Sequence, residues 1–292
     1  MTEATPKLEI GYDAQGRILP PTFRTPAENG HKYDRGHVGI VSGPVLATGA
    51  SRLSAGAALA MGAGLVTLYG ENDALHEHAA HVTAIMLADV AGLAKGEGRR
   101  VDAVVIGPGH GGGENTRKTV LALLQKGMPI VLDADALTAF ADDPESLFAA
   151  CHDKTVLAPH EGEFSRIFPD LNEEDRIARC QKAADRVGAT VLLKGARTVV
   201  AAPGGRVAVN EHASPFLATA GSGDVLSGMI GGLLGQGADP FDAACAAVWC
   251  HGDIGVRFGP GLTADRMAGV IPVVLAARTE EEGKGGRIGF LA

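Results

Sequence analysis

Short apolar runs that alternate with helical segments constrain the fold of this chain more than any other feature. The runs are rich in β-branched residues and span 38–43, 65–69, 101–107, 129–135, 155–160 and 190–195. Each is almost continuously apolar, as strands covered by helices on both faces are. Helices are expected at 50–63, 115–126, 135–141, 173–187, 223–236, 240–257 and 265–278. The alternation predicts an α/β fold, in which a mostly parallel central sheet has helices on both faces.

The ends of the chain differ from this pattern. Residues 1–36 combine prolines, turn-forming glycines and mixed charges, and we expect an arm that packs on the body or on a neighbouring subunit. No Pro-rich linker divides residues 37–282, which are expected to form a single domain. Segment 283–292 is expected to be a flexible tail. Within the domain, the runs 198–203 and 206–210 flank two glycines and predict a hairpin.

Composition excludes several classes of protein. The chain has 292 residues, of which 46% are hydrophobic, enough to bury a core without a disulfide or a metal. A net charge of −8 argues against partners such as nucleic acid or an anionic membrane. The beginning of the chain lacks the apolar core of a signal peptide, and no run is long and apolar enough to cross a membrane. We therefore expect a cytoplasmic protein.

Two groups of residues that are often functional receive a structural interpretation. The spacing of Cys151, Cys180, Cys245 and Cys250 shows no pairing, so we expect reduced and mostly buried thiols. The spacing of His76, His78 and His81 does not place all three on one helix face, and we expect a solvated surface rather than a metal site. Trp249 lies on an apolar helix and is expected in the core.

The most informative segment is a glycine-rich turn that opens into an apolar helix at 219–234. Gly221, Ser222 and Gly223 are expected to form an anion hole, because backbone amides at a helix N-terminus attract phosphate and a Cβ would block its approach. Asp224 follows in the first helical turn. A carboxylate there repels phosphate, which makes sense if it is a catalytic base. The alternative is a carboxylate that only stabilises the helix dipole.

A second glycine-rich segment follows the expected strand at 101–107. Segment 107–113 formally matches GxGxxG, with Asp133 at a strand end further on, as in dinucleotide-binding sites. However, Pro108 removes an amide from this turn, and the next helix is expected to be capped near Asn115 or Thr116. We therefore favour a glycine loop that faces a substrate.

Two further strand ends carry polar residues, at the edge where α/β sheets bind ligands. His160 and Glu161 can both point into a cleft, where His160 would hydrogen-bond or stack on a ligand; the alternative is a helix cap and a surface carboxylate. Lys194 can neutralise phosphate and Thr198 can bind a ribose or a base edge; the alternative is an ordinary strand end.

Taken together and in order, six motifs resemble those of the ADP- or ATP-dependent NAD(P)H-hydrate dehydratases of the ribokinase-like superfamily. The motifs are SGPVLATGASRLSAGAALAMGAGLVTLY, DAVVIGPG, IVLDADAL, LAPHEGEFSRI, LLKGARTVV and TAGSGDVLSGMIGGLL, and they span about residues 36–257. The resemblance implies a ribokinase-like three-layer sandwich. It also implies ADP-dependent repair of (S)-NADHX and NADPHX, the hydrates of NADH and NADPH, with ADP as co-substrate and Mg²⁺ as cofactor. A homotetramer and a separate NAD(P)H-hydrate epimerase as partner are further implications.

The resemblance also implies roles for particular residues. The residues that would face the hydrated nicotinamide are Ala50, Gly109, His160 and Asp224. The residues that would bind the adenine nucleotide, as ADP or its product AMP, are Lys194, Gly195, Ala196, Arg197, Thr198 and Gly223. Asp224 would be the catalytic base, and no residue is singled out as a metal ligand.

The chemistry of such a site agrees with these residues. Asp224 would deprotonate the hydroxyl of the hydrate, which attacks the terminal phosphate of ADP, and the anion hole would stabilise the developing charge. One alternative is a kinase of the same superfamily that acts on a vitamin alcohol and leaves a stable phosphate ester. Another is a Rossmann-type dinucleotide-binding protein or oxidoreductase, which would leave residues 221–224 without a role.

Overall fold

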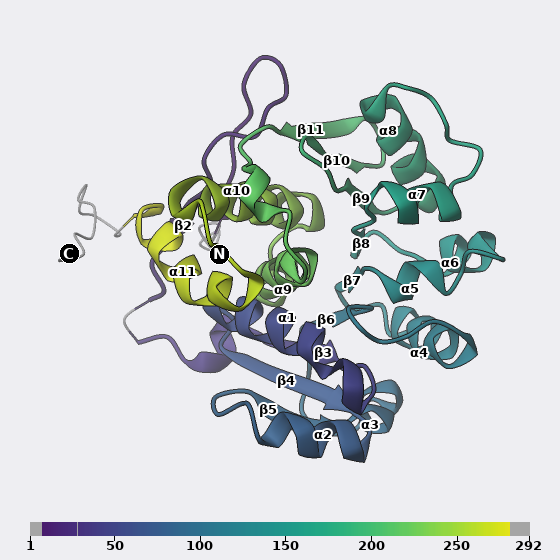
Figure 1. Cartoon of the computed structure of the whole chain (residues 1–292), viewed down its shortest axis with the longest axis vertical. Coiled ribbons are helices and arrows are strands. Elements are labelled where there is room, and N and C mark those ends of the chain that lie inside the picture. Colours follow the sequence, from purple (N-terminus) through teal and green to yellow (C-terminus); the bar gives the residue numbers. More distant parts are fainter. Residues whose placement is uncertain (1–7, 28, 281–292) are drawn as a thin grey trace, which may run out of the picture.

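A nine-stranded sheet forms the centre of the computed structural model, which describes residues 8–27 and 29–280 (Figure 1). The strand order is β11-β10-β9-β8-β7-β6-β3-β4-β5, and all neighbours from β9 to β5 are parallel. The strands are β3 (His37–Val41), β4 (Leu65–Gly70), β5 (Met86–Asp89), β6 (Ala103–Ile106), β7 (Ile130–Leu132), β8 (Thr155–Leu157), β9 (Thr190–Leu193), β10 (Thr198–Ala202) and β11 (Arg206–Asn210). The expected hairpin is confirmed as the antiparallel pair β10–β11.

Helices cover both faces of this sheet, so the predicted α/β architecture is confirmed (Figure 1). One face packs against α1 (Thr48–Ala60), α9 (Ser222–Gly235), α10 (Pro240–Phe258) and α11 (Ala264–Ala276). The other packs against α3 (Val90–Lys95), α4 (Glu114–Leu124), α5 (Asp135–Thr138), α6 (Pro144–Ala150), α7 (Glu161–Ile167) and α8 (Arg176–Val187). Helix α2 (Asn72–Ala79) lies beside β4 and β5. Three short 3-10 turns complete the body, η1 (Lys32–Arg35), η2 (Val45–Ala47) and η3 (Pro215–Leu217).

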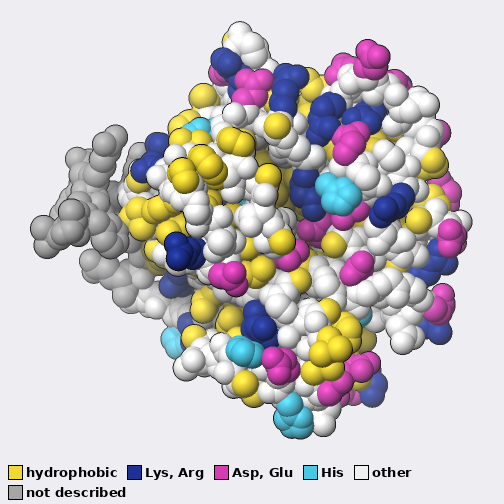
Figure 2. Space-filling model, in the orientation of Figure 1, with side chains coloured by type: hydrophobic (Ala, Val, Ile, Leu, Met, Phe, Trp, Pro, Cys, Tyr) yellow, Lys and Arg dark blue, Asp and Glu magenta, His cyan; other side chains and the backbone are white. Residues whose placement is uncertain are grey.

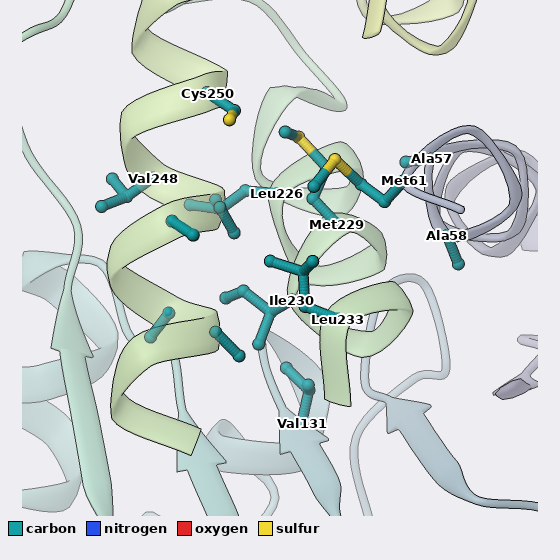
Figure 3. Close-up of a cluster of buried hydrophobic side chains, with 14 of the residues drawn as sticks. Ala57, Ala58, Met61, Val131, Leu226, Met229, Ile230, Leu233, Val248 and Cys250 are labelled. Carbon is teal, nitrogen blue, oxygen red and sulfur yellow. The ribbon is translucent and has the colours of Figure 1, made fainter. Parts of the chain in front are cut away.

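Helix α9 is the central element of the first face. Its Leu226, Met229, Ile230 and Leu233 point into a cluster shared with α1, α10 and β7 (Figure 3). Its glycines bring the neighbours close: a Cβ on Gly228 would lie 2.1 Å from the carbonyl oxygen of Ser54 on α1. Ser54 also donates a hydrogen bond of 2.8 Å from Oγ to the carbonyl of Asp224. The start of α9 is therefore held in place by α1.

The first described residues contact the body at the hairpin edge. The strands β1 (Leu8–Glu9), β2 (Thr22–Arg24) and β12 (Thr279–Glu280) form a small second sheet. Between β1 and β2, the amide of Ile18 donates to the carbonyl of Val209 on β11 over 2.9 Å, and the Ile18 side chain is buried. The expected tail, 283–292, lies outside the described residues.

Several local expectations have clear outcomes. Trp249 is buried, and Cys180, Cys245 and Cys250 are buried while Cys151 is partly exposed, all four as free thiols. The expectation of a solvated histidine surface is wrong for His78, which is fully buried with its Nε2 2.7 Å from Ser42 Oγ. Within the described residues, no helix combines the length and the apolar character needed to cross a bilayer.

Helix α4 begins slightly earlier than the sequence suggests. Its first residue is Glu114, and Gly113 occupies the cap position with a φ of +111°, so no side chain caps the helix. The expected caps, Asn115 and Thr116, lie within its first turn, where the Thr116 hydroxyl donates back to the carbonyl of Gly111 over 2.5 Å.

The close packing of α1 on α9 predicts different effects of two glycine substitutions. Gly228→Ala should lower the free energy of unfolding by about 1–3 kcal/mol, because its methyl group overlaps the backbone of α1. Gly269→Ala, on α11 with no atom near its Cβ position, should raise it by about 0.5–1 kcal/mol. Urea unfolding of both variants measures the difference, and a Gly228→Ala variant as stable as the wild type would contradict the packing described.

Candidate active site

A cavity of about 740 Å³ opens where β8 and β9 end and α9 begins. Figure 2 shows this face, with basic and histidine side chains beside a hollow between the α9–α11 side and the α7–α8 side. The lining brings together several residues that the sequence singles out: His160, Lys194, Gly195, Ala196, Thr198, Ser222 and Gly223. Arg197 does not line the cavity; its exposed guanidinium pairs with Glu211 over 3.1 Å.

Parallel register explains why residues far apart in the sequence meet here. Beyond the end of β8, His160 forms an isolated parallel bridge with Lys194, and the Lys194 amide donates to Pro159 over 2.9 Å. Asp133 directly follows β7, the next strand of the sheet. The three polar residues therefore sit at the same carboxyl edge, where α/β sheets bind ligands.

A buried ion pair lies beneath the cavity. The Lys194 ammonium is 2.5 Å from one oxygen of Asp133, and the Ser227 hydroxyl donates to the other over 2.6 Å. Glu163 approaches the same ammonium at 3.8 Å. Burial alone would lower the pKa of Lys194, but Asp133 and Glu163 raise it above its ordinary value. Lys194 is therefore charged but already has acidic partners before any phosphate arrives.

The glycine-rich turn leads directly to the ion pair. Gly221 has a φ of +86°, and a Cβ there would lie 2.5 Å from Leu53 Cδ1 on α1, so only glycine fits. The Ser222 amide already donates to the carbonyl of Thr219 over 3.2 Å. Gly223 faces Lys194, whose Nζ would lie 3.5 Å from a Cβ at that position. Amides at the second and third positions of a helix have no acceptor within it, and these remain available to an anion.

Asp224 stands at this junction with a perturbed carboxyl. Its pKa is raised to about 6, first by burial and then by the charge of Asp133, while Lys194 opposes the shift. A carboxyl that titrates close to neutral pH is suited to accept a proton in a reaction. Structural carboxylates at helix N-termini generally have the opposite shift. The electrostatics favour the catalytic interpretation over the helix-dipole one.

His160 has two roles in the geometry. Its Nδ1 accepts hydrogen bonds from the amides of Gly162 and Glu163, at 2.9 and 3.2 Å, and so caps α7. The Glu163 carboxylate returns the contact by accepting from the His160 amide over 2.7 Å. The ring still lines the cavity, and its Nε2 lies 3.3 Å from Oε1 of Glu163. Glu161 is not among the lining residues, and its carboxylate pairs with Arg179 over 2.5 Å.

Ala50 and Gly109 form a separate group next to α9. Gly109 has a φ of +66°, and a Cβ there would lie 3.1 Å from the Ala50 methyl group. Neither residue lines the 740 Å³ cavity. The start of α1 connects them to the turn, because Leu53 packs against Gly221. Asp224, in the first turn of α9, is not among the lining residues, but Gly223 directly before it lines the cavity, and Gly221 meets Leu53 of α1.

Sequence reasoning missed several polar residues of the cavity wall, among them Glu211, His251 and Asn210. His251 on α10 is buried, with its Nε2 3.0 Å from the Ser222 hydroxyl, and burial lowers its pKa to about 4. Asn210, at the end of β11, donates from Nδ2 to two backbone carbonyls. A histidine inside the apolar run of α10 was a signal that could have been read. Across residues 8–27 and 29–280, no group of three or more His, Cys, Asp or Glu side chains is arranged to hold a metal.

Removal of Lys194 should expose the dependence of this region on its charge. Lys194→Met leaves Asp133 buried without its cation, and we expect a loss of about 3–5 kcal/mol in the free energy of unfolding. The double variant Lys194→Met/Asp133→Asn should recover much of this loss, because no uncompensated charge remains. Chemical unfolding of both variants tests the pair, and equal stability of the single and double variants would show that the pair is not coupled.

The raised pKa of Asp224 predicts a pH-dependent cost in stability. Stability that comes from the protonated carboxyl is present below the unfolded pKa near 4 and is lost as the pH rises through about 6. Asp224→Asn should therefore melt at a higher temperature than the wild type at pH 8, with a difference that disappears near pH 4. Asp265→Asn, in the first turn of α11, is the matched control and should melt slightly lower at pH 8. An Asp224→Asn variant that melts like the control would contradict the shift.

Comparison with known proteins identifies the family of this chain. The family model described as NAD(P)H-hydrate dehydratase matches residues 38–272. The ADP-dependent (S)-NAD(P)H-hydrate dehydratase of Neisseria meningitidis is 38% identical, over 87% of this chain and 88% of that one. A bifunctional NAD(P)H-hydrate repair enzyme of Mycobacterium tuberculosis is 40% identical over 80% of this chain, which spans only about half (48%) of that relative's length.

A solved structure shows the same arrangement of the chain. The ADP/ATP-dependent NAD(P)H-hydrate dehydratase of Bacillus subtilis, co-crystallised with ATP and Mg²⁺, superposes with a TM-score of 0.74 at 25% identity, covering 87% of this chain and 93% of that one. A ribokinase-like protein of Enterococcus faecalis, 23% identical, shares the fold with a TM-score of 0.77 over 87% and 91% of the two chains. The fold is thus shared with a ribokinase-like protein, and the chain belongs to the NAD(P)H-hydrate dehydratase family.

Proposed function

We propose that this chain is an ADP-dependent (S)-NAD(P)H-hydrate dehydratase, a lyase that restores NADH and NADPH from their hydrates while ADP becomes AMP and phosphate. The observation that carries the proposal is Asp224, a carboxyl with a pKa near 6 in the first turn of α9, beside a cavity of nucleotide size. The Neisseria meningitidis relative, matched along most of both chains, bears this activity in its name.

The chemistry needs a base and a phosphate site side by side. The hydrate carries a hydroxyl on the carbon next to the ring nitrogen, and hydroxide is a poor leaving group. Asp224 takes the hydroxyl proton while the oxygen attacks the terminal phosphorus of ADP, and AMP leaves. The ring nitrogen then expels the new phosphate group with its C–O electron pair, and loss of a neighbouring proton restores the dihydropyridine. The amides at the start of α9 stabilise charge on the transferred phosphoryl group.

The proposed ligand positions follow the two groups of residues around α9. The nucleotide would occupy the cavity lined by Lys194, Gly195, Ala196, Thr198 and Gly223. Arg197 would contribute through its backbone, because it does not line the cavity and its guanidinium is paired with Glu211, which does.

The hydrated ring would lie against Ala50, Gly109 and Asp224. His160 lines the nucleotide cavity, so in this arrangement it would meet the hydrate where the two ligands join. The reacting hydroxyl and the terminal phosphate would then converge on Asp224, with Gly221, Ser222 and Gly223 around the phosphate.

Mg²⁺, the cofactor we propose, fits this donor set only in part. Both carboxylate oxygens of Asp133 already have partners, whereas Asp224 has an available carboxylate beside the phosphate site. Mg²⁺ in nucleotide enzymes is usually held by one or two carboxylates and by the phosphates themselves. Because Asp224 has to accept the proton, we assign it no bond to the metal; the phosphates of the nucleotide would hold the ion, which would neutralise their charge.

The remaining proposals concern the cellular setting. We propose a cytoplasmic homotetramer, with the location supported by four free cysteines. A separate NAD(P)H-hydrate epimerase is the proposed partner. The support is that bifunctional repair enzymes match this chain over only about half of their length.

Asp224→Asn is the sharpest test of the proposed mechanism. The amide keeps the shape of the carboxyl but cannot accept a proton, so the rate of NADH formation from NADHX, ADP and Mg²⁺ should fall roughly 10²–10⁴-fold. Affinity for ADP should hold or rise, because a negative charge beside the phosphates is removed.

The wild type should form NADH from NADHX when a nucleotide is present and should form none without it. The absorbance of NADH measures this reaction. A kinase of vitamin alcohols would instead leave a stable phosphate ester and no NADH. Near-wild-type turnover by Asp224→Asn, or turnover without any nucleotide, would overturn the mechanism.

A further inference from the structure

A second cavity, of about 530 Å³, lies on the other side of the glycine-rich turn. Its walls come from α1, from the segment between α2 and β5, and from the start of α11. Leu53 connects it to the catalytic region: the side chain lines this cavity and also packs against Gly221, three residues before Asp224. Ala50, next to Gly109, lies one turn earlier on the same helix. Leu53 and the neighbouring residues of α1 thus place the cavity near the proposed position of the hydrated ring.

The cavity contains a cation with free hydrogen-bonding capacity. The Arg52 guanidinium lines it, donates one hydrogen bond of 2.8 Å to the Thr48 hydroxyl, and forms no ion pair with any residue in the described parts of the chain. A guanidinium has five N–H donors, so most of them remain available. The charge of Arg52 also acts on His78. Burial, and after it the positive charge of Arg52, lowers the pKa of His78 to about 4.

The other polar groups of this cavity define the ligand further. Asp265 lies on the α11 wall, where a carboxylate accepts hydrogen bonds from hydroxyl groups. His81 also lines it, with Nε2 2.9 Å from Glu77. Arg52 thus supplies a donor fork that matches phosphate, while Asp265 supplies an acceptor that matches sugar hydroxyls. Apolar contacts from Leu53 and Leu59 complete the wall.

We propose that this cavity binds the pyrophosphate and adjoining ribose of the dinucleotide hydrate, with Arg52 on the pyrophosphate. The inference rests on the proposed function, which supplies a substrate much larger than its reacting ring. With ADP in the 740 Å³ cavity, the rest of that substrate needs a different place. Arg52 is a binding residue here, two positions along α1 from Ala50, and takes no part in the proton transfer.

Kinetics with substrates of different length test the assignment. Arg52→Gln should raise the KM for NADHX roughly tenfold or more, because a charge-assisted contact is lost, while kcat and the KM for ADP stay nearly unchanged. The hydrate of reduced nicotinamide riboside has no phosphate, and its KM should be the same for the variant and the wild type. Arg52→Lys keeps the positive charge but not the two parallel N–H donors of the guanidinium. Its KM for NADHX should lie between those of the wild type and Arg52→Gln.

Thr48→Val is the matched control, because it removes the internal partner of Arg52 and leaves the guanidinium in place. Its KM for NADHX should remain near that of the wild type. An unchanged KM for NADHX in Arg52→Gln would overturn the proposal. An equal rise for the phosphate-free hydrate would also overturn it, since the effect would then come from a distorted α1.

A binding measurement separates this inference from the proposed function. The intrinsic fluorescence of NADH reports its binding without turnover. Arg52→Gln should weaken the binding of NADH by a factor similar to the rise in KM. Reduced nicotinamide riboside should bind with equal affinity to the variant and the wild type. If the wild type fails to repair NADHX, the proposed function is wrong, and the NADH titration still decides whether the cavity takes a dinucleotide. Equal NADH affinity in both proteins would exclude the cavity as a dinucleotide site.

Discussion

The buried ion pair between Lys194 and Asp133 is the contact on which the candidate active site depends. It joins the ends of β7 and β9, and through Ser227 it also joins α9, so three elements from distant parts of the chain meet at one carboxylate. Two charges removed from water repay their desolvation only when their remaining hydrogen bonds are satisfied. Here Ser227 accounts for the second oxygen of Asp133. The pair therefore fixes the floor of the cavity, and a phosphate group would meet a rigid cation.

The same pair sets the chemistry of Asp224. Burial and the negative charge of Asp133 raise its pKa, while Lys194 limits the rise. The result is a carboxyl that titrates near neutrality, as a general base needs to. Close packing makes this position possible: Gly228 lets α9 approach α1, and Ser54 holds the backbone carbonyl of Asp224. Helix packing and acid–base chemistry are thus two consequences of one arrangement.

Much of the fold was predictable because its signals are local. Continuous apolar runs identified the parallel strands around the site, and glycine followed by an apolar helix identified α9 within about one residue. The short strand β5 was missed, since its sequence Met-Leu-Ala-Asp contains no β-branched residue. His78 was misplaced for a different reason: its burial depends on Ser42, 36 residues away, and no local pattern encodes that contact.

The candidate site was predictable only in part, and the reason is again distance along the chain. Lys194, Thr198 and Gly223 were recognised at strand and helix ends, and they line one cavity. That Lys194 already has acidic partners was not visible, because Asp133 comes from the end of β7 and Glu163 from the first turn of α7. Arg52 was also overlooked, since only the meeting of α1, α11 and the segment before β5 turns its charge toward a cavity.

The central claim is that the hydroxyl of the hydrate is phosphorylated before it leaves. Its most direct test is to follow the oxygen: NADHX labelled with ¹⁸O in that hydroxyl is converted with ADP, and the products are analysed by mass spectrometry. The account predicts that the label appears in inorganic phosphate, in an amount equal to the NADH formed. Label in water, with phosphate unlabelled, would contradict it.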